Sequence, residues 1–304
     1  MAAQLRAVRA RIRAVKSIAK ITRAQELIAS SRIIRAQQRT RAAEPYAREL
    51  TQAVEALVNR SSTITHPMIT EPETTTRAAV LILTSDGGFA GAYNANVLRE
   101  ASRLRQRNQE NRVTSLTYVA GRKGIAWHRF REIPLLGEWS GFSARPTYAD
   151  AEAVASALLE AFEAPTADGG VDEIFLVSTE FVSMLTQRPV VHRLLPMEIE
   201  ERPGERPGGP LPAYEFEPST EVVLDALLPQ YVASRIYYAM LEAAASELAA
   251  RRRAMKAATD NANDLIDRLT REANNARQAE ITQEISEIVG GANALAEANA
   301  GSEY

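Results

Sequence analysis

The sequence contains no cysteine and few aromatic residues. Without cysteine there can be no disulfide, no thiolate nucleophile and no cysteine-ligated metal site. The three histidines, His66, His128 and His192, are far apart and match neither HExxH nor C2H2 spacing, so no metal site is predicted. Aromatic residues make up 6% of the chain, which predicts an aliphatic core.

Long hydrophobic runs are also missing. No apolar run approaches the roughly 18–20 residues that a membrane-spanning helix needs. The N-terminus lacks the apolar region of a secretory signal. Its basic, amphipathic character could mimic a mitochondrial transit peptide, but the pattern continues for about 55 residues, which favours mature structure over a removable leader.

Charge is distributed unevenly along the chain. Residues 1–44 contain nine arginines and two lysines against Glu26 and Glu44, a net charge of +9. The whole chain carries −2, so the remaining residues carry −11. This asymmetry predicts that one end of the chain meets an acidic partner.

The first 60 residues follow a heptad pattern of apolar and small residues. Its positions are Leu5, Val8, Ile12, Val15, Ala19, Thr22, Glu26, Ala29, Ile33, Ala36, Thr40, Ala43, Ala47, Leu50, Val54 and Leu57. Only Glu26 among them is charged, which is typical of a coiled-coil seam. Pro45 is expected to kink this helix. The helix would span roughly 80 Å, so it needs a partner along its length.

A second helical pattern begins near Ser219, with an N-cap residue followed by acidic residues in the first turn. After Pro229 no proline or glycine occurs before Gly290. Its spaced positions are Met255, Ala258, Ala262, Leu265, Leu269, Glu272, Ala276, Ile281, Ile285, Ile288, Ala292 and Leu295. We therefore expect the N- and C-terminal helices to form a long antiparallel coiled coil.

The middle of the chain predicts a different architecture. "RAAVLILTS" and "DEIFLVST" are continuous apolar runs like those of buried parallel strands, and "VTSLTYVAG" alternates more. Helical patterns at about 92–108, 120–131 and 149–163 separate these runs, which predicts a Rossmann-like α/β domain inserted between the long helices. "VVHRLLPM" and "AYEFEP" are expected to be later strands, at an edge because of the flanking prolines.

The predicted fold class is therefore α/β with three segments. Residues 1–76 form the N-terminal coiled-coil helix, and residues 77–212 form the α/β domain. Residues 213–304 contain the last strand and the C-terminal coiled-coil helix. Two exposed loops are expected around 165–170 and 201–212, where proline and glycine concentrate.

The stretch "TSDGGFAGAYNANV" raises the question of a nucleotide site. A dinucleotide fingerprint needs glycine at i, i+2 and i+5, but these positions hold Asp86, Gly88 and Gly91. No Gly-Lys-Ser/Thr of a P-loop occurs. We interpret the loop as a strand-to-helix turn in which Asp86 caps the following helix. No cofactor and no nucleotide are predicted.

Other motifs do not predict an active site either. No GxSxG elbow is present, and no nucleophile stands beside a base. The chain is therefore not expected to be an enzyme. An alternative function is that of a basic coiled-coil protein that binds nucleic acid or acts as a scaffold, which the +9 segment would permit. A nicotinamide-dependent enzyme is disfavoured by the broken glycine spacing.

Four segments resemble the gamma subunits of F-type ATP synthases. They are "KITRAQELIASSRIIRAQ", "SDGGFAGAYN", "RAMKAATDNA" and "ARQAEITQEISEIVGGANAL". Their order and spacing agree with that family over essentially the whole chain. The resemblance implies a non-catalytic central rotor stalk whose paired helices stand inside the alpha/beta hexamer, with the α/β domain resting on the epsilon subunit and the c-ring. Rotation of the c-ring would drive the beta subunits through their cycle of ATP synthesis.

The resemblance also implies particular contacts. "ARQAEITQE" resembles the segment that meets a beta-subunit loop, and nominates Arg277, Gln278, Thr282 and Glu284. Ile281, Ile285 and Ile288, with Val289 and Leu295, would enter an apolar collar of the hexamer. Arg252 and Lys256, with Arg251 and Arg253, would meet acidic loops of the beta subunits. Tyr214 and Glu217 would lie near epsilon and the c-ring.

Two positions depart from the family pattern. Gln25 stands where the family often has methionine, and Gly87 stands where it commonly has arginine. The alanine- and arginine-rich chain has no cysteine-bearing insertion, which suggests a bacterial protein on the cytoplasmic face of the plasma membrane. Such a protein would be peripheral, touching the membrane only through the c-ring, and would bind no nucleic acid.

Overall fold

A computed structural model describes residues 2–60, 66–197 and 220–300, and the side chains of 5–56, 66–197 and 222–293. Within these ranges the chain forms two compact units, one of residues 1–28 with 254–304 and one of residues 29–253. Two long helices, α1 (Ala2–Arg60) and α5 (Thr220–Ala300), contribute to both units. Among the described residues, no helix combines the length and apolarity that crossing a membrane requires.

The larger unit is built on a five-stranded sheet in the order β3-β2-β1-β4-β5. The strands are β1 (Arg77–Leu83), β2 (Thr114–Ala120), β3 (Gly137–Trp139), β4 (Glu173–Phe181) and β5 (Gln187–Leu195). All neighbouring strands are parallel except β4 and β5, which pair antiparallel. The sheet is therefore mostly parallel, and its carboxyl edge collects the loops that follow β1, β2 and β4.

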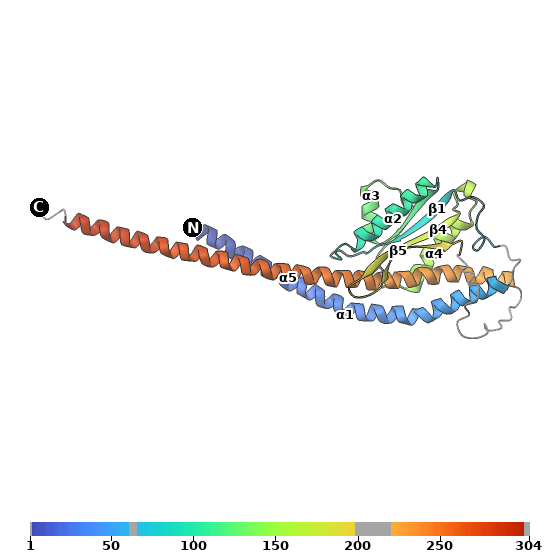
Figure 1. Ribbon diagram of the computed structural model, residues 1–304, viewed down its shortest axis with the longest axis horizontal. Coiled ribbons are helices and arrows are strands. Elements are labelled where there is room, and N and C mark those ends of the chain that lie inside the picture. The colour runs from blue at the N-terminus through green and yellow to red at the C-terminus, as the bar shows by residue number, and fades with distance from the viewer. Residues whose placement is uncertain (1, 61–65, 198–219, 301–304) are drawn as a thin grey trace. The chain divides into compact units, whose positions relative to one another are not determined.

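Helices cover both faces of this sheet (Figure 1). On one face, α2 (Tyr93–Glu110) and α3 (Arg122–Phe130) pack with Val80, Ile82 and Val119. On the other face, α4 (Tyr148–Glu163) packs beside α1 and α5 in the main apolar core. Strand residues therefore alternate between two buried faces, which explains why β1 reads as a continuous apolar run. A short 3-10 turn, Thr166–Asp168, follows α4.

The segment of α5 inside this unit is enclosed. Residues 243–250 are all buried, and five of them are alanine. A helix that is buried on every side needs small or apolar residues around its whole circumference. The sheet domain covers one side of it, and Ile33 and Ala36 of α1 pack against another. Figure 1 shows α1 running along α5 in this unit, in agreement with that contact.

In the smaller unit, α1 and α5 pair through the predicted seam. Leu5 and Val8 pack against Leu269 and Ala273. The Thr22 and Thr259 hydroxyl oxygens lie 2.7 Å apart in a buried hydrogen bond. Across both units, every predicted seam position of α1 from residue 5 to residue 54 is buried or half-buried. The seam prediction for α1 is therefore confirmed for its described side chains; Leu57 lies outside them.

One detail of the helix predictions differs from the structure. Glu272 was expected on the seam of α5, but it is exposed and Ala273 is buried instead. The smaller methyl group permits close approach of the helices, whereas the carboxylate is better solvated. α1 is continuous through Pro45 and α5 is continuous through Pro229. The kink expected at Pro45 stays a prediction.

The predicted α/β elements agree with the structure at β1, β2, β4, β5 and the three helices between them. β5 is an edge strand, as expected from its proline. The sequence analysis missed β3, which is only three residues long. The predicted strand at 213–218 and the loop at 201–212 lie outside the described residues, and the boundaries at 76 and 212 remain predictions.

Candidate functional site

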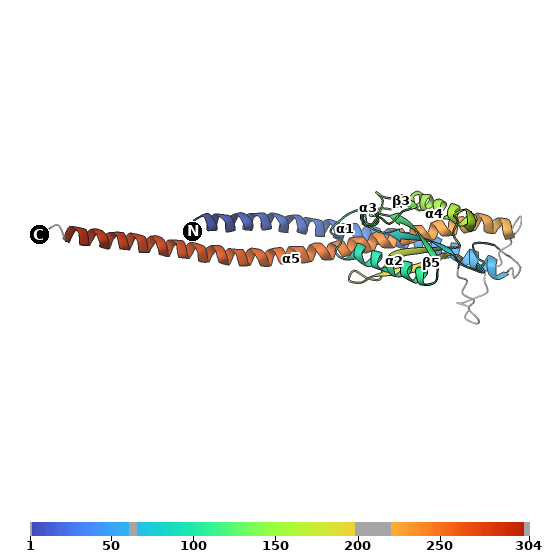
Figure 2. The same cartoon turned by 90° about the horizontal axis from the view of Figure 1, so that it is seen from above.

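The C-terminal part of α5 carries an exposed apolar stripe. From residue 277 to residue 293 every described side chain is exposed or nearly so, although the segment is helical. Ile281, Ile285 and Ile288 are 45%, 56% and 71% exposed, and Val289 is 52% exposed. In Figures 1 and 2 this part of α5 continues beyond the start of α1. The helix therefore presents an apolar face that α1 does not cover.

The polar residues predicted for this segment lie on the same stretch of helix. Arg277, Gln278, Thr282 and Glu284 are all exposed. The Thr282 hydroxyl donates to the Gln278 carbonyl at 2.9 Å, so this side chain folds back on its own helix. The structure brings these four residues together with the three isoleucines within about three helical turns.

A basic groove runs between the two helices of the smaller unit, with a volume of about 810 Å³. Its lining includes Lys16, Lys20 and Arg23 from α1, and Asp260 from α5. Exposed apolar residues of α1, Ile18, Ile21, Leu27 and Ile28, lie along the same part of the helix. The combination of positive charge and apolar surface suits an acidic, amphipathic partner.

The predicted basic contacts near residue 252 have different surroundings. Lys256 is exposed and its ammonium forms an ion pair with Asp260 at 3.0 Å. Arg252 is half-buried, and its Nε atom is buried without a hydrogen-bond partner among the described residues. Arg251 and Arg253 bond to loops of the α/β domain. The four neighbouring basic residues therefore do not form one free surface.

The glycine loop after β1 is a turn held by side chains. The amide of Ser85 donates to Asn94 Oδ1 at 2.9 Å, and the amide of Asp86 donates to Ser143 Oγ at 2.8 Å. Within it Phe89 has a positive φ of 60° and is 79% exposed. These two amides of the loop are thus already bonded within the protein rather than pointing into an open anion site.

Asp86 was predicted to cap the helix that follows the loop, and this prediction was wrong because the residue caps a different helix. α2, the helix that follows the loop, begins after Ala92 without a side-chain cap. The Asp86 carboxylate instead accepts from Arg122 N at 3.0 Å, and from Gly141 N and Ser143 N at 2.8 and 3.0 Å. Arg122 is the first residue of α3, so the carboxylate caps α3 across the sheet edge.

Its environment also sets the acidity of this carboxyl group. Burial alone would raise the pKa of Asp86, but the backbone hydrogen bonds from Ser143, Arg122 and Gly141 outweigh it and the pKa is lowered. Asp86 therefore stays ionised and holds two loops to α3 at neutral pH.

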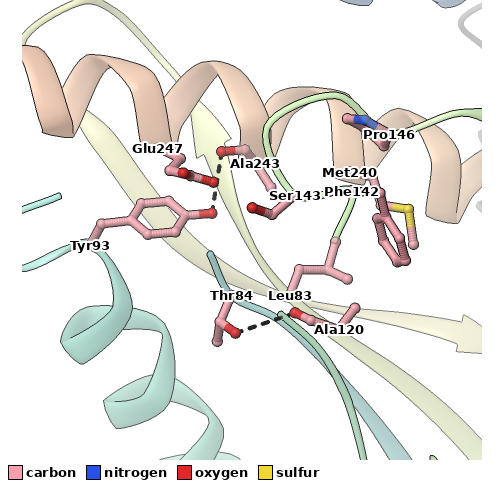
Figure 3. A pocket seen from close by; sticks show the side chains of 10 residues that line it. All are labelled: Leu83, Thr84, Tyr93, Ala120, Phe142, Ser143, Pro146, Met240, Ala243 and Glu247. Atoms are coloured by element: carbon pink, nitrogen blue, oxygen red, sulfur yellow. Dashed lines mark hydrogen bonds between the residues drawn. The ribbon is translucent and has the colours of Figure 1, made fainter. Parts of the chain in front are cut away.

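A small cavity beside this loop reaches α5 (Figure 3). Tyr93 from α2, Ser143 from the loop before α4, and Glu247 from α5 point toward one another there (Figure 3). The Tyr93 hydroxyl donates to the Ala243 carbonyl at 3.2 Å, and Glu247 pairs with Arg251 at 2.6 Å. Burial raises the pKa of both Tyr93 and Glu247, and Arg251 opposes the rise in each case. The sequence analysis missed this cluster because its members are 154 residues apart in the chain.

No cluster of three or more His, Asp or Glu side chains within the described ranges is placed to hold a metal ion. The predicted partner residues Tyr214 and Glu217 lie outside the described residues, and the side chain of Leu295 lies outside the described side chains.

Comparison with known proteins decides the family. The family model described as ATP synthase matches residues 4–295. The ATP synthase gamma chain of Thermobifida fusca is 60% identical over 306 residues, covering 100% of both chains. The chain belongs to the ATP synthase gamma chain family. A gamma chain of Streptomyces coelicolor is 56% identical over 305 residues, again covering 100% of both chains.

Solved structures agree with this family at the level of the fold. A chain of the Euglena gracilis mitochondrial ATP synthase, from an OSCP/F1/c-ring structure, matches with a TM-score of 0.69 at 16% identity, covering 100% of this chain and 97% of that one. A chain from the Tetrahymena thermophila central stalk and c-ring matches with a TM-score of 0.57 at 22% identity, covering 78% and 99%. At low sequence identity, chains of these two solved ATP synthase structures thus share the fold of this chain.

Proposed function

We propose that this chain is the central rotor subunit of an ATP synthase. Its two paired helices stand inside a hexamer of alpha and beta subunits and couple rotation to the conformational cycle that makes ATP. The chain itself is non-catalytic, and the nucleotides are held by the hexamer. The membership in the gamma chain family and the match over residues 4–295 support this role.

The exposed stripe of α5 is the observation that carries the proposal. Ile281, Ile285 and Ile288 are exposed on a helix that has no partner in the described chain beyond residue 276. Burying the part of each side chain that is still exposed would contribute roughly 1–2 kcal/mol. An apolar collar of the hexamer is the partner that the family implies for this stripe.

The polar residues beside the stripe complete the proposed contact. Arg277, Gln278, Thr282 and Glu284 supply charged and amide groups next to the isoleucines. We assign them to a loop of the beta subunit. Arg252 and Lys256, which come earlier in α5, and the basic groove would meet acidic segments of the same subunits as the chain rotates.

The α/β domain would face the membrane-embedded part of the machine. We assign it to contacts with the epsilon subunit and the c-ring, with Tyr214 and Glu217 at that end. The chain would lie on the cytoplasmic face of a bacterial plasma membrane, attached through the c-ring. The nucleic-acid-binding alternative has no support from the family match.

Truncation of α5 tests this function. A chain ending at Ala276 removes the exposed stripe and leaves the packed seam from Leu5 to Ala273 in place. We expect the truncated chain to fold with an unchanged melting temperature of the α/β domain, but to bind an alpha/beta hexamer at least about tenfold more weakly. A matched control, Ile281→Leu, keeps apolar area and should bind like the parent chain. Equal binding by the truncated and full chains would contradict the proposal.

A further inference from the structure

The last turns of α5 in the larger unit are tied to two different loops of the α/β domain. Arg251 Nε donates to the Gly88 carbonyl at 3.2 Å, in the loop that follows β1. The Arg253 guanidinium donates to the Leu185 carbonyl and to the Gln187 side chain, in the turn between β4 and β5. Because β1 and β4 are parallel, both loops leave the same edge of the sheet.

The Arg251 contact is buried and closely fitted. The side chains of Arg251 and Glu247 are 14% and 2% exposed, and the Nη2–Oε1 distance is 2.6 Å. A Cβ added to Gly87 would lie 2.7 Å from Arg251 Nη2, so the absence of a side chain at 87 permits this approach. A charge-assisted hydrogen bond in such surroundings is stronger and more directional than an exposed ion pair.

Further hydrogen bonds continue along the same helix. The Tyr93 hydroxyl donates to Ala243 O at 3.2 Å, and the Ser246 hydroxyl donates to the Thr179 carbonyl at 3.3 Å. Figure 3 shows Tyr93 and Ser143 directed toward the turn of α5 that carries Glu247. Three successive turns of α5 are therefore bonded to the domain by directional contacts.

The apolar packing of α5 changes along the larger unit: long side chains such as Leu228 and Ile236 pack into the main core, whereas residues 243–250 offer mostly small ones. The buried surface of α5 between 243 and 250 is mostly alanine methyl groups. Shallow methyl ridges interlock less than long side chains, so they resist turning of the helix about its axis less strongly. Hydrogen bonds weaken steeply when their angle changes, so they fix that rotation.

We propose that Arg251 bound to Gly88 and Arg253 bound to Leu185 form a torsional anchor, through which the α/β domain holds the rotational position of α5. Glu247 is a positioning residue that directs the Arg251 guanidinium toward the loop. The anchor deepens the proposed function, on which it rests: in a rotor, twist applied to the domain must reach the helices through such contacts.

The test uses the assembled complex in membrane vesicles. Arg251→Gln/Arg253→Gln removes both guanidinium groups, and Arg107→Gln on the exposed face of α2 is the matched control. We expect the double variant to keep ATP hydrolysis within about twofold while ATP-driven ion transport per ATP falls at least about threefold. Arg251→Lys, which keeps the charge but not the planar fork, should lie between the two.

A covalent link separates a torsional role from general damage. Ala90 and Ala250 pack in one cluster with Tyr93, and the chain has no cysteine of its own. Adding Ala90→Cys/Ala250→Cys to the double variant and oxidising it should restore the transport per ATP. Unchanged transport in the double variant would overturn the anchor, and so would a loss that the verified crosslink fails to restore. If the parent chain does not join a hexamer at all, the rotor function fails instead.

Discussion

At the sheet edge, the role of a single residue depends on partners that are distant from it in the sequence. Asp86 is next to the glycines that resemble a phosphate loop, yet its carboxylate accepts from three backbone amides, two of them more than 50 residues away. A negative charge fixed there fills the place where an anion would bind at the start of α3. The residue is thus part of the loop structure.

Replacing Asp86 should loosen the loop without unfolding the domain. Asp86→Ala leaves the amides of Arg122, Gly141 and Ser143 without their acceptor, and we expect a loss of about 1–3 kcal/mol in the free energy of unfolding. Hydrogen exchange at 122 and 141–143 should rise. Asp86→Asn, which keeps one acceptor oxygen, should lose less, and equal stability of the alanine variant would contradict the assigned role.

The same carboxyl group predicts an effect of pH. Its pKa in the folded chain is below the ordinary value of 3.8, so its stabilisation is complete above that value and is lost as pH falls through the lowered pKa. The Asp86→Ala variant should therefore approach the parent chain in stability only in strong acid.

Elements that are distant in sequence converge on a second group of charges. The charges of Glu44 of α1, Glu180 of β4 and Arg235 of α5 all act on Glu242 of α5. Glu180 also lies 2.8 Å from Arg188 Nη2 and 3.3 Å from His192 Nε2. Burial, with the charge of Glu180 and then of Glu44, raises the pKa of Glu242 to about 7, while Arg235 opposes the rise. This half-buried carboxyl group titrates near neutrality.

Stability of the α/β domain should therefore depend on the protonation of Glu242. The folded chain holds this proton more tightly than the unfolded chain, where glutamate titrates near 4.5. The free energy of unfolding should thus fall as pH rises from about 4.5 to about 7, and level off above. Glu242→Gln should reduce this fall by about 1 kcal/mol, allowing for solvent screening.

Tryptophan fluorescence can measure this effect, because Trp127 and Trp139 both lie in the α/β domain. Urea unfolding at pH 5 and pH 8 gives the two free energies. Glu152→Gln, on the exposed face of α4, is the control and should behave like the parent chain. If the free energy of unfolding of Glu242→Gln fell between pH 5 and pH 8 by as much as that of the parent chain, the fall could not be assigned to Glu242.

Periodicity predicted the elements better than it predicted their contacts. The seam of α1 and the strands β1 and β4 could be predicted from local patterns. A buried helix face recurs every three to four residues, and a buried strand is a short continuous apolar run. β3 was missed since three residues carry no period. Glu272 was placed on the seam wrongly because it and its neighbour Ala273 both fit a spacing of three to four residues. Only the alanine is buried in the structure.

In the candidate site, too, local patterns predicted some features and missed the contacts between distant residues. The spacing of the isoleucines of α5 predicted an apolar face, and the family resemblance implied an outside partner for it. Their exposure agrees with such a face. The pairing of Arg251 with Gly88, and of Tyr93 with Ala243, joins residues 163 and 150 positions apart. No pattern within one sequence encodes such contacts, because they depend on how the sheet edge meets α5.

On the scale of the whole molecule, charge is distributed unevenly along the chain. Residues 1–44 carry +9 in a chain of net −2, and Lys16, Lys20 and Arg23 line the groove of the smaller unit. Charges at the mouth of such a groove accelerate the encounter with an acidic partner, and salt screens them beyond about 10 Å at 0.1 M ionic strength. The groove should therefore act mainly on the rate of assembly.

Assembly with an alpha/beta hexamer should slow as salt is added. We expect the association rate constant of the parent chain to fall by about tenfold or more between 20 and 300 mM salt. Lys16→Gln/Lys20→Gln/Arg23→Gln should have a slower rate at low salt and a flatter salt dependence, measured by stopped-flow mixing. Arg99→Gln/Arg103→Gln/Arg107→Gln on α2 removes the same charge elsewhere. An identical salt slope for both triple variants would contradict a specific role of the groove.

Rotation of the chain itself tests the central claim most directly. The hexamer is fixed to a surface, and a probe is attached to the exposed face of α2 in the α/β domain. We predict that ATP drives continuous rotation of the probe in one direction, and that rotation stops when ATP is removed. A complex that hydrolyses ATP while the probe stays still would contradict the account.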